Sequence, residues 1–329
     1  MDEYKGVMVY CETMEGKIAP VANELLGGGR KLANALGEKL TAVLIGKDIS
    51  YLAQGPIAYG ADNVYVVDHP LLKDYQTDPY VSVMEKLVGQ TMPRILLMGQ
   101  TAIGRDLAPK LAFRLGTGAS LDCLDLSIDP GSKRLMMTRP VYGGNALATF
   151  TCDFKPQIAA VRSKALPPLG PDSSRRGEVI AFAADLDESV IRTRVVEKVT
   201  EEVVGIKLED AEVIVCGGRG IGSAEGFKEL EDLAKALKGA VAATRSACDN
   251  GWAPLGSQIG ITGKIVAPDL YIGIGLSGSS QHLSGCSGAK NIIAINRDPE
   301  ANLFNVARFG VVGDWNRVLP AFRNALFPK

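Results

Sequence analysis

The feature that most constrains the fold is a glycine-rich loop that follows a short apolar run near the C-terminus. Residues 270–274 are apolar and are typical of a buried strand. Glycines follow at 273, 275 and 278, a G-x-G-x-x-G spacing that lets backbone approach a pyrophosphate. An NAD-binding domain would place an acid about 20 residues further on, where this chain has Asn296. The segment predicts a dinucleotide site in a parallel α/β domain, and not an obvious NAD site.

Length and charge limit the class of protein. With 329 residues the chain is long enough for two domains, because single cores stop growing near roughly 250–300 residues. A net charge of −1 offers no basic surface for nucleic acid. No run of about 18 apolar residues predicts a membrane span, and the polar N-terminus is not a secretory signal. We expect a cytoplasmic protein.

The six cysteines are far apart in the sequence, and no C-x-x-C pair occurs among them. That spacing argues against a zinc or iron–sulfur site. Scattered cysteines also fit thiols kept in a reducing cytoplasm. No metal is expected.

Strand and helix patterns alternate along the first half of the chain. This alternation favours a parallel sheet with helices on both faces. Gly37 follows the first helix as a C-cap. The expected strands are residues 6–10, 40–45, 64–67 and 95–98, and the expected helices are residues 21–36, 49–58 and 80–88.

The pattern changes after residue 121, where apolar segments become short and are separated by turns. Residues 121–128, 135–141, 146–150 and 158–161 are expected to be antiparallel strands added to the edge of the first sheet. Residues 166–178 are rich in proline, glycine and charge and predict a surface loop. A last strand is expected over 195–204, and the domain boundary is placed between residues 206 and 207.

Residues 207–329 predict a second, doubly wound α/β domain. Ser223 is expected to cap a helix that ends near residue 238. Later apolar runs continue the alternation. The expected strands are 211–216, 240–244, 270–274, 292–295 and 311–312, followed by a helix from residue 315.

Four loops of this domain follow strand ends, the edge at which open α/β sheets bind ligands. They carry Arg219, the pair Thr244 and Arg245, Thr262, and the segment 277–282 with His282. A solvated Arg219 on a tight turn and a plain glycine-rich connector at 258–264 are the competing interpretations. No nucleophile elbow, metal cluster or carboxylate pair is evident in the sequence. Hydroxyls, arginines, one histidine and backbone N–H groups suit a redox cofactor that brings its own chemistry.

At this point the sequence resembles the alpha subunit of electron-transfer flavoprotein. The resemblance rests on one motif in the first half and five in the second, in the family's order and spacing. They are residues 99–109, 217–220, 244–247, 260–268, 275–282 and 294–299.

The resemblance implies one FAD in the C-terminal domain. Thr262 would lie near N5, Arg245 against the ring, and His282 at the N1/C2 edge, where these three would tune the flavin electrostatically. The pyrophosphate would contact Arg219, Ser277, Gly278, Ser279, Ser280 and Gln281. Asn296 and Asp314 would lie near the adenosine, while Thr244, Ile259, Gly260 and Ile261 would complete the flavin site. Trp315 is expected to be a further cofactor-binding residue. The family commonly has Gln at 261, Ser at 244 and Met at 286, where this chain has Ile261, Thr244 and Cys286.

The resemblance also implies a function, that of a redox carrier subunit and not a stand-alone enzyme. Such a subunit pairs with a beta subunit through its N-terminal domain and passes single electrons to a dehydrogenase, expected to be of the acyl-CoA dehydrogenase type. Residues 138–145 are similar to the NADH-linked, electron-bifurcating members. Two alternatives stay open: a self-contained NAD(P)-dependent oxidoreductase that uses residues 273–278, and a regulatory module that binds a nucleotide in the first domain.

Overall fold

A computed structural model describes residues 4–14, 16–144, 146–197 and 206–326. The chain divides into two compact units, one made of residues 1–141 and 147–199 and the other of residues 142–146 and 200–329. The predicted boundary after residue 206 lies next to residues 198–205, which fall outside the described residues, and it stays a prediction. Mixed α/β structure in both units confirms the predicted fold class.

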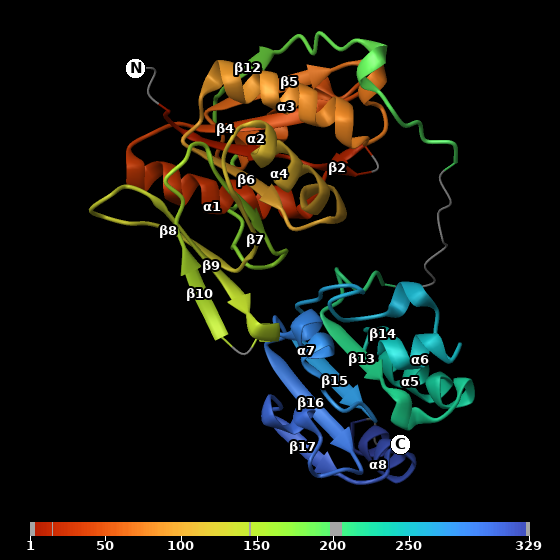
Figure 1. Ribbon diagram of the computed structural model, residues 1–329. Helices are drawn as coiled ribbons and strands as arrows, with labels where there is room; N and C mark the ends of the chain where they lie inside the picture. The colour runs from red at the N-terminus through yellow and green to blue at the C-terminus, as the bar shows by residue number, and fades with distance from the viewer. Residues whose placement is uncertain (1–3, 15, 145, 198–205, 327–329) are drawn as a thin grey trace. The chain divides into compact units, whose positions relative to one another are not determined.

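The first unit is built on a seven-stranded sheet in which every neighbouring pair is parallel (Figure 1). Val7 of the central strand lies opposite Leu40 on one side and Ile95 on the other. The central strands are fully buried, as expected of parallel strands covered on both faces. In spatial order the strands are β12 (Glu178–Ala181), β5 (Asn63–Asp68), β4 (Leu40–Gly46), β1 (Val7–Tyr10), β6 (Ile95–Gly99), β11 (Gln157–Val161) and β7 (Ala119–Cys123).

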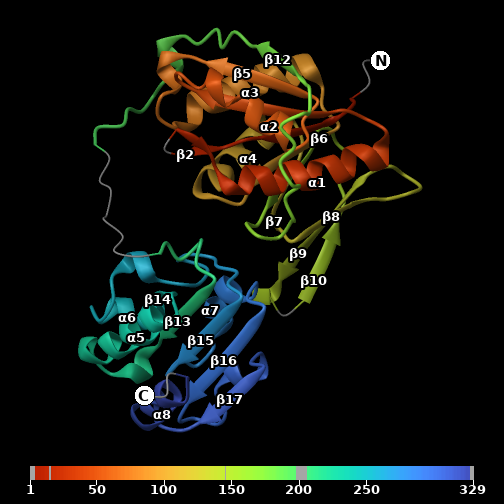
Figure 2. The same cartoon turned by 180° about the vertical axis from the view of Figure 1, so that it is seen from behind.

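Alternate residues of β1 pack into two cores, one on each face of this sheet. Val7 and Val9 pack in the core that contains Leu25 of α1, and Met8 packs in the core that contains Leu87 of α3. Figures 1 and 2 show the helices beside this sheet in two opposite views. The helices are α1 (Pro20–Leu36), α2 (Gln54–Ala58), α3 (Thr77–Thr91) and α4 (Ala102–Arg114), with short 3-10 turns η1 (Ser50–Leu52), η2 (Pro70–Leu72), η3 (Tyr142–Gly144) and η4 (Glu188–Val190).

The structure confirms the predicted end of the first helix and differs from the prediction in two other places. Gly37 ends α1 in the left-handed conformation, with φ 69°, so the C-cap prediction holds. The helix expected over residues 49–58 is divided into η1 and α2. A small antiparallel pair, β2 (Thr13–Met14) and β3 (Lys17–Ile18), had not been expected.

The predicted antiparallel extension at the sheet edge is wrong in part. β11 lies inside the large sheet between β6 and β7, and it is parallel to both. The segment 121–128 is two strands, because Leu124 separates β7 from β8 (Asp125–Ile128) and Asp122 has φ 63°. β8 pairs antiparallel with β9 (Leu135–Val141) in a separate three-stranded sheet that also holds β10 (Ala146–Phe150). Within the strand expected over 195–204, residues 195–197 form no strand and 198–204 lie outside the described residues.

The second unit has a five-stranded parallel sheet with β13 (Val213–Gly217) next to its centre. The chain moves outward from β13 to one side first and then to the other, an order written 2-1-3-4-5 in doubly wound sheets. In spatial order the strands are β14 (Ala240–Ala243), β13, β15 (Leu270–Ile274), β16 (Asn291–Asn296) and β17 (Phe309–Val312).

Helices pack against both faces of this second sheet. Val215 packs in a core with Phe227 of α5 and Leu319 of α8, and Ile214 packs in the opposite core with Cys286 of α7. Ser223 caps α5 as predicted, since its hydroxyl accepts from the amide of Gly226. The helices are α5 (Ala224–Ala236), α6 (Arg245–Asp249), α7 (Ser280–Cys286) and α8 (Trp315–Leu326), with turns η5 (Arg219–Ile221), η6 (Leu255–Ser257) and η7 (Asn302–Asn305).

Candidate functional site

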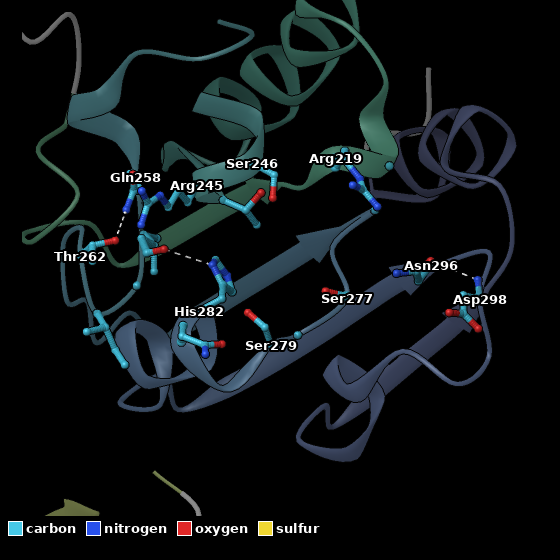
Figure 3. A pocket seen from close by; sticks show the side chains of 18 of the residues that line it. Arg219, Arg245, Ser246, Gln258, Thr262, Ser277, Ser279, His282, Asn296 and Asp298 are labelled. Carbon is cyan, nitrogen blue, oxygen red and sulfur yellow. Dashed lines mark hydrogen bonds between the residues drawn. The ribbon is translucent and has the colours of Figure 1, made fainter. Parts of the chain in front are cut away.

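A cavity of about 630 Å³ lies at the carboxyl ends of β13, β14, β15 and β16 (Figure 3). This edge contains the point where the chain reverses direction across the sheet, between β13 and β15, and open α/β sheets bind ligands at that point. The volume is within the range of small-molecule and cofactor sites. The topology and the cavity therefore indicate the same binding edge.

The cavity brings together thirteen of the sixteen predicted site residues. The other three lie outside its lining. Asp314 accepts from the amide of Asn316 at the start of α8, and the indole N–H of Trp315 donates to the carbonyl of Gly220 at 3.1 Å. The residues brought together are Arg219, Thr244, Arg245, Ile259, Gly260, Ile261, Thr262, Ser277, Gly278, Ser279, Gln281, His282 and Asn296, and the third residue outside is Ser280.

Six lining residues were absent from the residues assigned to FAD, although Gly275 belongs to the predicted glycine fingerprint: Gly220, Ser246, Gln258, Gly275, Arg297 and Asp298. Two of them could have been found, because Arg297 and Asp298 directly follow the end of β16 and strand ends line such sites. Asp298 also places a carboxylate two residues after Asn296, which stands where an NAD-binding domain would have its acid. Gln258 gave no sequence signal of its own.

The cavity presents more positive than negative charge. Arg219, Arg245 and Arg297 line it, against the single carboxylate of Asp298. Within the described residues no hydrogen bond uses the amide N–H groups of the loop 277–279. Guanidinium groups and free amides together favour a phosphate-bearing ligand. This geometry supports the interpretation of Arg219 as a site residue.

The glycines of the predicted fingerprint serve packing as well as ligand approach. The turns after β13 and β15 are bonded to each other, since the amide of Gly220 donates to the carbonyl of Gly275 at 2.8 Å. A side chain on Gly278, which has φ 74°, would collide with the backbone of Leu303. Gly273 also abuts Leu303 and does not line the cavity. Gly273 therefore serves packing, whereas Gly275 and Gly278 line the cavity.

Two threonine hydroxyls differ in how they are paired. Thr262 accepts from the side-chain amide of Gln258 at 2.9 Å, and a hydroxyl that accepts still has a hydrogen to donate. The hydroxyl oxygen of Thr244 is buried without any partner, although Thr244 occupies the N-cap position of α6. A buried polar atom of this kind at a cavity wall calls for a ligand.

Two other predicted residues already use their polar groups within the protein. The amide of Ile261 donates to the carbonyl of Gln281 at 2.9 Å, so Ile261 offers neither a side-chain donor nor a free amide. The side chain of Asn296 donates to the carbonyl of Leu276 and accepts from the amide of Asp298. Asn296 therefore ties the ends of β15 and β16 together while it lines the cavity.

His282 is buried at the cavity wall with both ring nitrogens engaged. Nε2 lies 2.7 Å from the hydroxyl of Tyr271. Nδ1 lies 3.1 Å from the carbonyl of Ile259, a contact drawn as a dashed line in Figure 3. Burial lowers the pKa of His282 to about 4, which leaves the ring neutral at pH 7. The expected position beside the cavity is observed, whereas the tuning role assigned to His282 stays a prediction.

Comparison with known proteins agrees with this geometry. The electron transfer flavoprotein domain model matches residues 7–187, and the electron transfer flavoprotein FAD-binding domain model matches residues 207–287. The chain is 44% identical over 321 residues to the electron transfer flavoprotein subunit alpha of Thermoanaerobacterium thermosaccharolyticum, covering 97% of each chain. It is also 44% identical to the protein of that name from Megasphaera elsdenii, covering 98% of this chain and 97% of the relative.

A third relative, the acryloyl-CoA reductase electron transfer subunit beta of Anaerotignum propionicum, is 35% identical, with 99% of this chain and 96% of the relative covered.

The residues of the cavity fit FAD. The unpaired hydroxyl of Thr244 suits the polar edge of the flavin ring. The free amides of 277–279 and the three arginines suit the negatively charged pyrophosphate. FAD is the cofactor of this subunit. The chain belongs to the electron transfer flavoprotein family, as an alpha subunit with its FAD-binding domain in the C-terminal half.

Proposed function

We propose that this alpha subunit is a one-electron carrier that works with a beta subunit and delivers electrons to a flavin-dependent dehydrogenase of the acyl-CoA type. The observation that supports a carrier is the composition of the cavity wall. Its lining offers arginines, hydroxyls and amides, with Asp298 as its one carboxylate. Across the described residues no group of acids, histidines or cysteines could hold a metal. FAD supplies the redox chemistry when bound.

The residues of the chain would bind the cofactor and set its electrostatic environment. Arg219 and the amides of 277–279 would hold the pyrophosphate. Thr244 and Thr262 each have a hydroxyl hydrogen to donate to the polar edge of the ring. Arg245 carries a cation in the half of the cavity that contains Thr262 (Figure 3), where it would stabilise negative charge gained on reduction.

A beta subunit is the partner that we propose for this chain. The relatives named subunit alpha support a heteromeric assembly. The first unit also exposes large apolar side chains on and just after β10: Leu147 is 64% exposed and Phe154 is 66% exposed. Exposed apolar groups gathered on one segment are typical of a surface that another protein covers.

The dehydrogenase partner is inferred from the relative in an acryloyl-CoA reductase, whose name makes it an electron transfer subunit of a CoA-linked redox enzyme. The similarity of residues 138–145 to NADH-linked, bifurcating members supports a second part of the proposal, that NADH drives the heterodimer. Asn145 of that motif lies outside the described residues, and Tyr142 is highly exposed. The structure describes no helix that is long and apolar enough to cross a membrane.

Co-purification with the beta subunit tests the proposal. The heterodimer should be yellow, and reduced heterodimer should pass electrons to an acyl-CoA dehydrogenase in the presence of its enoyl-CoA product. Two FAD per heterodimer would support NADH-driven bifurcation, and one FAD with AMP would support a simple carrier. A colourless protein that oxidises NADH with a small substrate would overturn the proposal in favour of a nicotinamide-dependent oxidoreductase.

A further inference from the structure

A buried polar cluster adjoins the cavity wall at His282, and the proposed function does not use it. Its centre is Tyr271 of β15, which is 0% exposed. The tyrosine hydroxyl lies 2.7 Å from Nε2 of His282, and Cys216 and Cys286 lie within interaction range of the same hydroxyl. All four side chains are buried, so each polar atom must find its partner within the protein.

The partners of His282 decide which ring nitrogen carries the proton. A backbone carbonyl only accepts, so the carbonyl of Ile259, 3.1 Å from Nδ1, requires a hydrogen on Nδ1. Burial keeps the ring neutral at pH 7, since the pKa of His282 is lowered to about 4. Nε2 is then an acceptor, and the nearby hydroxyl of Tyr271 is its donor.

This arrangement connects the sheet to the loop that faces the flavin. The ring of His282 holds the carbonyl of Ile259. The neighbouring amide of Ile261 donates to the carbonyl of Gln281, and the amide of Val266 donates to the carbonyl of Gly285. Three hydrogen bonds thus join residues 259–266 to α7. Two of them join backbone groups, and the third is made by the side chain of His282.

We propose that Tyr271 is a positioning residue of the FAD site: its hydroxyl donates to Nε2 of His282, and the ring so oriented holds the Ile259 carbonyl and the loop 259–262 in place for the cofactor. His282 then has no N–H group left to direct at FAD, and it acts through the loop. The inference deepens the proposed function, and it concerns cofactor binding rather than electron delivery.

The proton assignment can be tested in the unmodified heterodimer. This chain contains two histidines, His69 and His282, so a heterodimer in which only this chain carries ring-nitrogen-labelled histidine yields few NMR signals, and loss of a signal in His282→Gln assigns it. We expect the neutral tautomer with hydrogen on Nδ1 and a hydrogen-bonded Nε2. Hydrogen on Nε2, or a charged ring at pH 7, would overturn the proposal without any variant of Tyr271.

The positioning role is tested with Tyr271→Phe. We expect the Nε2 signal to move toward that of an unbonded acceptor and FAD to bind about tenfold more weakly, because Nε2 loses its donor at 2.7 Å and keeps only the weak thiol donor of Cys216 at 4.0 Å. Tyr80→Phe is the matched control, since it removes another buried tyrosine hydroxyl, which donates to the carbonyl of Leu72 in the first unit. Unchanged FAD affinity in Tyr271→Phe would refute the role, while yellow wild-type protein that still transfers electrons would leave the proposed function standing.

Discussion

Replacing Thr244 by valine should stabilise the FAD-free protein against unfolding and at the same time weaken FAD binding. The Thr244 hydroxyl is buried without a partner, and an unpaired buried polar group costs about 1–3 kcal/mol. Valine has nearly the same shape and no such group. We expect the free energy of unfolding of the FAD-free heterodimer to rise by about 1 kcal/mol or more.

FAD binding should change in the opposite direction. A hydrogen bond between the Thr244 hydroxyl and the cofactor is worth about 0.5–1.5 kcal/mol, so its loss should raise the Kd for FAD by roughly three- to tenfold. Because ligand binding adds to stability through mass action, saturating FAD should cancel most of the gain seen in its absence. The two effects together distinguish a ligand-seeking hydroxyl from an ordinary packing position.

Urea unfolding with and without FAD, together with fluorescence titration of the cofactor, measures both effects. Thr262→Val is the matched control: its hydroxyl accepts from Gln258, so its loss should destabilise the FAD-free protein by about 1 kcal/mol. A destabilised Thr244→Val protein, or one with unchanged FAD affinity, would refute the reasoning about Thr244.

Three further predictions concern charge, capping and pH. Arg245→Ala should lower the first reduction potential of the flavin by about 60 mV and change the unfolding free energy by less than about 0.5 kcal/mol, because its ion pair with Asp249 is exposed; an unchanged potential in a redox titration removes Arg245 from the role. Ser223→Ala should cost about 1 kcal/mol in urea unfolding by uncapping α5, and no measurable loss would count against the cap. Burial raises the pKa of Glu12 to about 7, so the folded protein favours the neutral carboxyl. The free energy of unfolding of the wild type should therefore fall by up to about 3 kcal/mol between pH 5 and pH 7.5. If Glu12→Gln shows a fall of the same size, Glu12 is not the cause of the pH dependence.

The second unit was largely predictable, because its signals are local. Apolar runs such as 270–274 and 292–295 are buried strands in the structure, and Ser223 caps the helix that its position predicted. Loops that follow the strand ends were read as site residues for the same reason: in a parallel sheet the carboxyl ends meet at one edge. Sequence order alone therefore collected most of the cavity lining.

Strand partners in the first unit could not be read from the chain. β11 has a short apolar run between turns, which is equally typical of an antiparallel strand, and its place between β6 and β7 depends on pairing with residues far away in the sequence. β12 was missed because three of its four side chains are exposed. An exposed edge strand shows no burial pattern from which it could be predicted.

What the sequence determined by itself is which residues stand at strand ends, and hence the identity of the FAD-binding edge. Tertiary structure alone decided how their polar groups are used. His282 is as noticeable in the sequence as Thr244, yet folding pairs the first with Tyr271 and Ile259 and leaves the hydroxyl of the second without a partner. Hydrogen bonding inside a protein depends on distances of about 3 Å between groups that the chain order separates, so only the folded chain shows which donors remain for the cofactor.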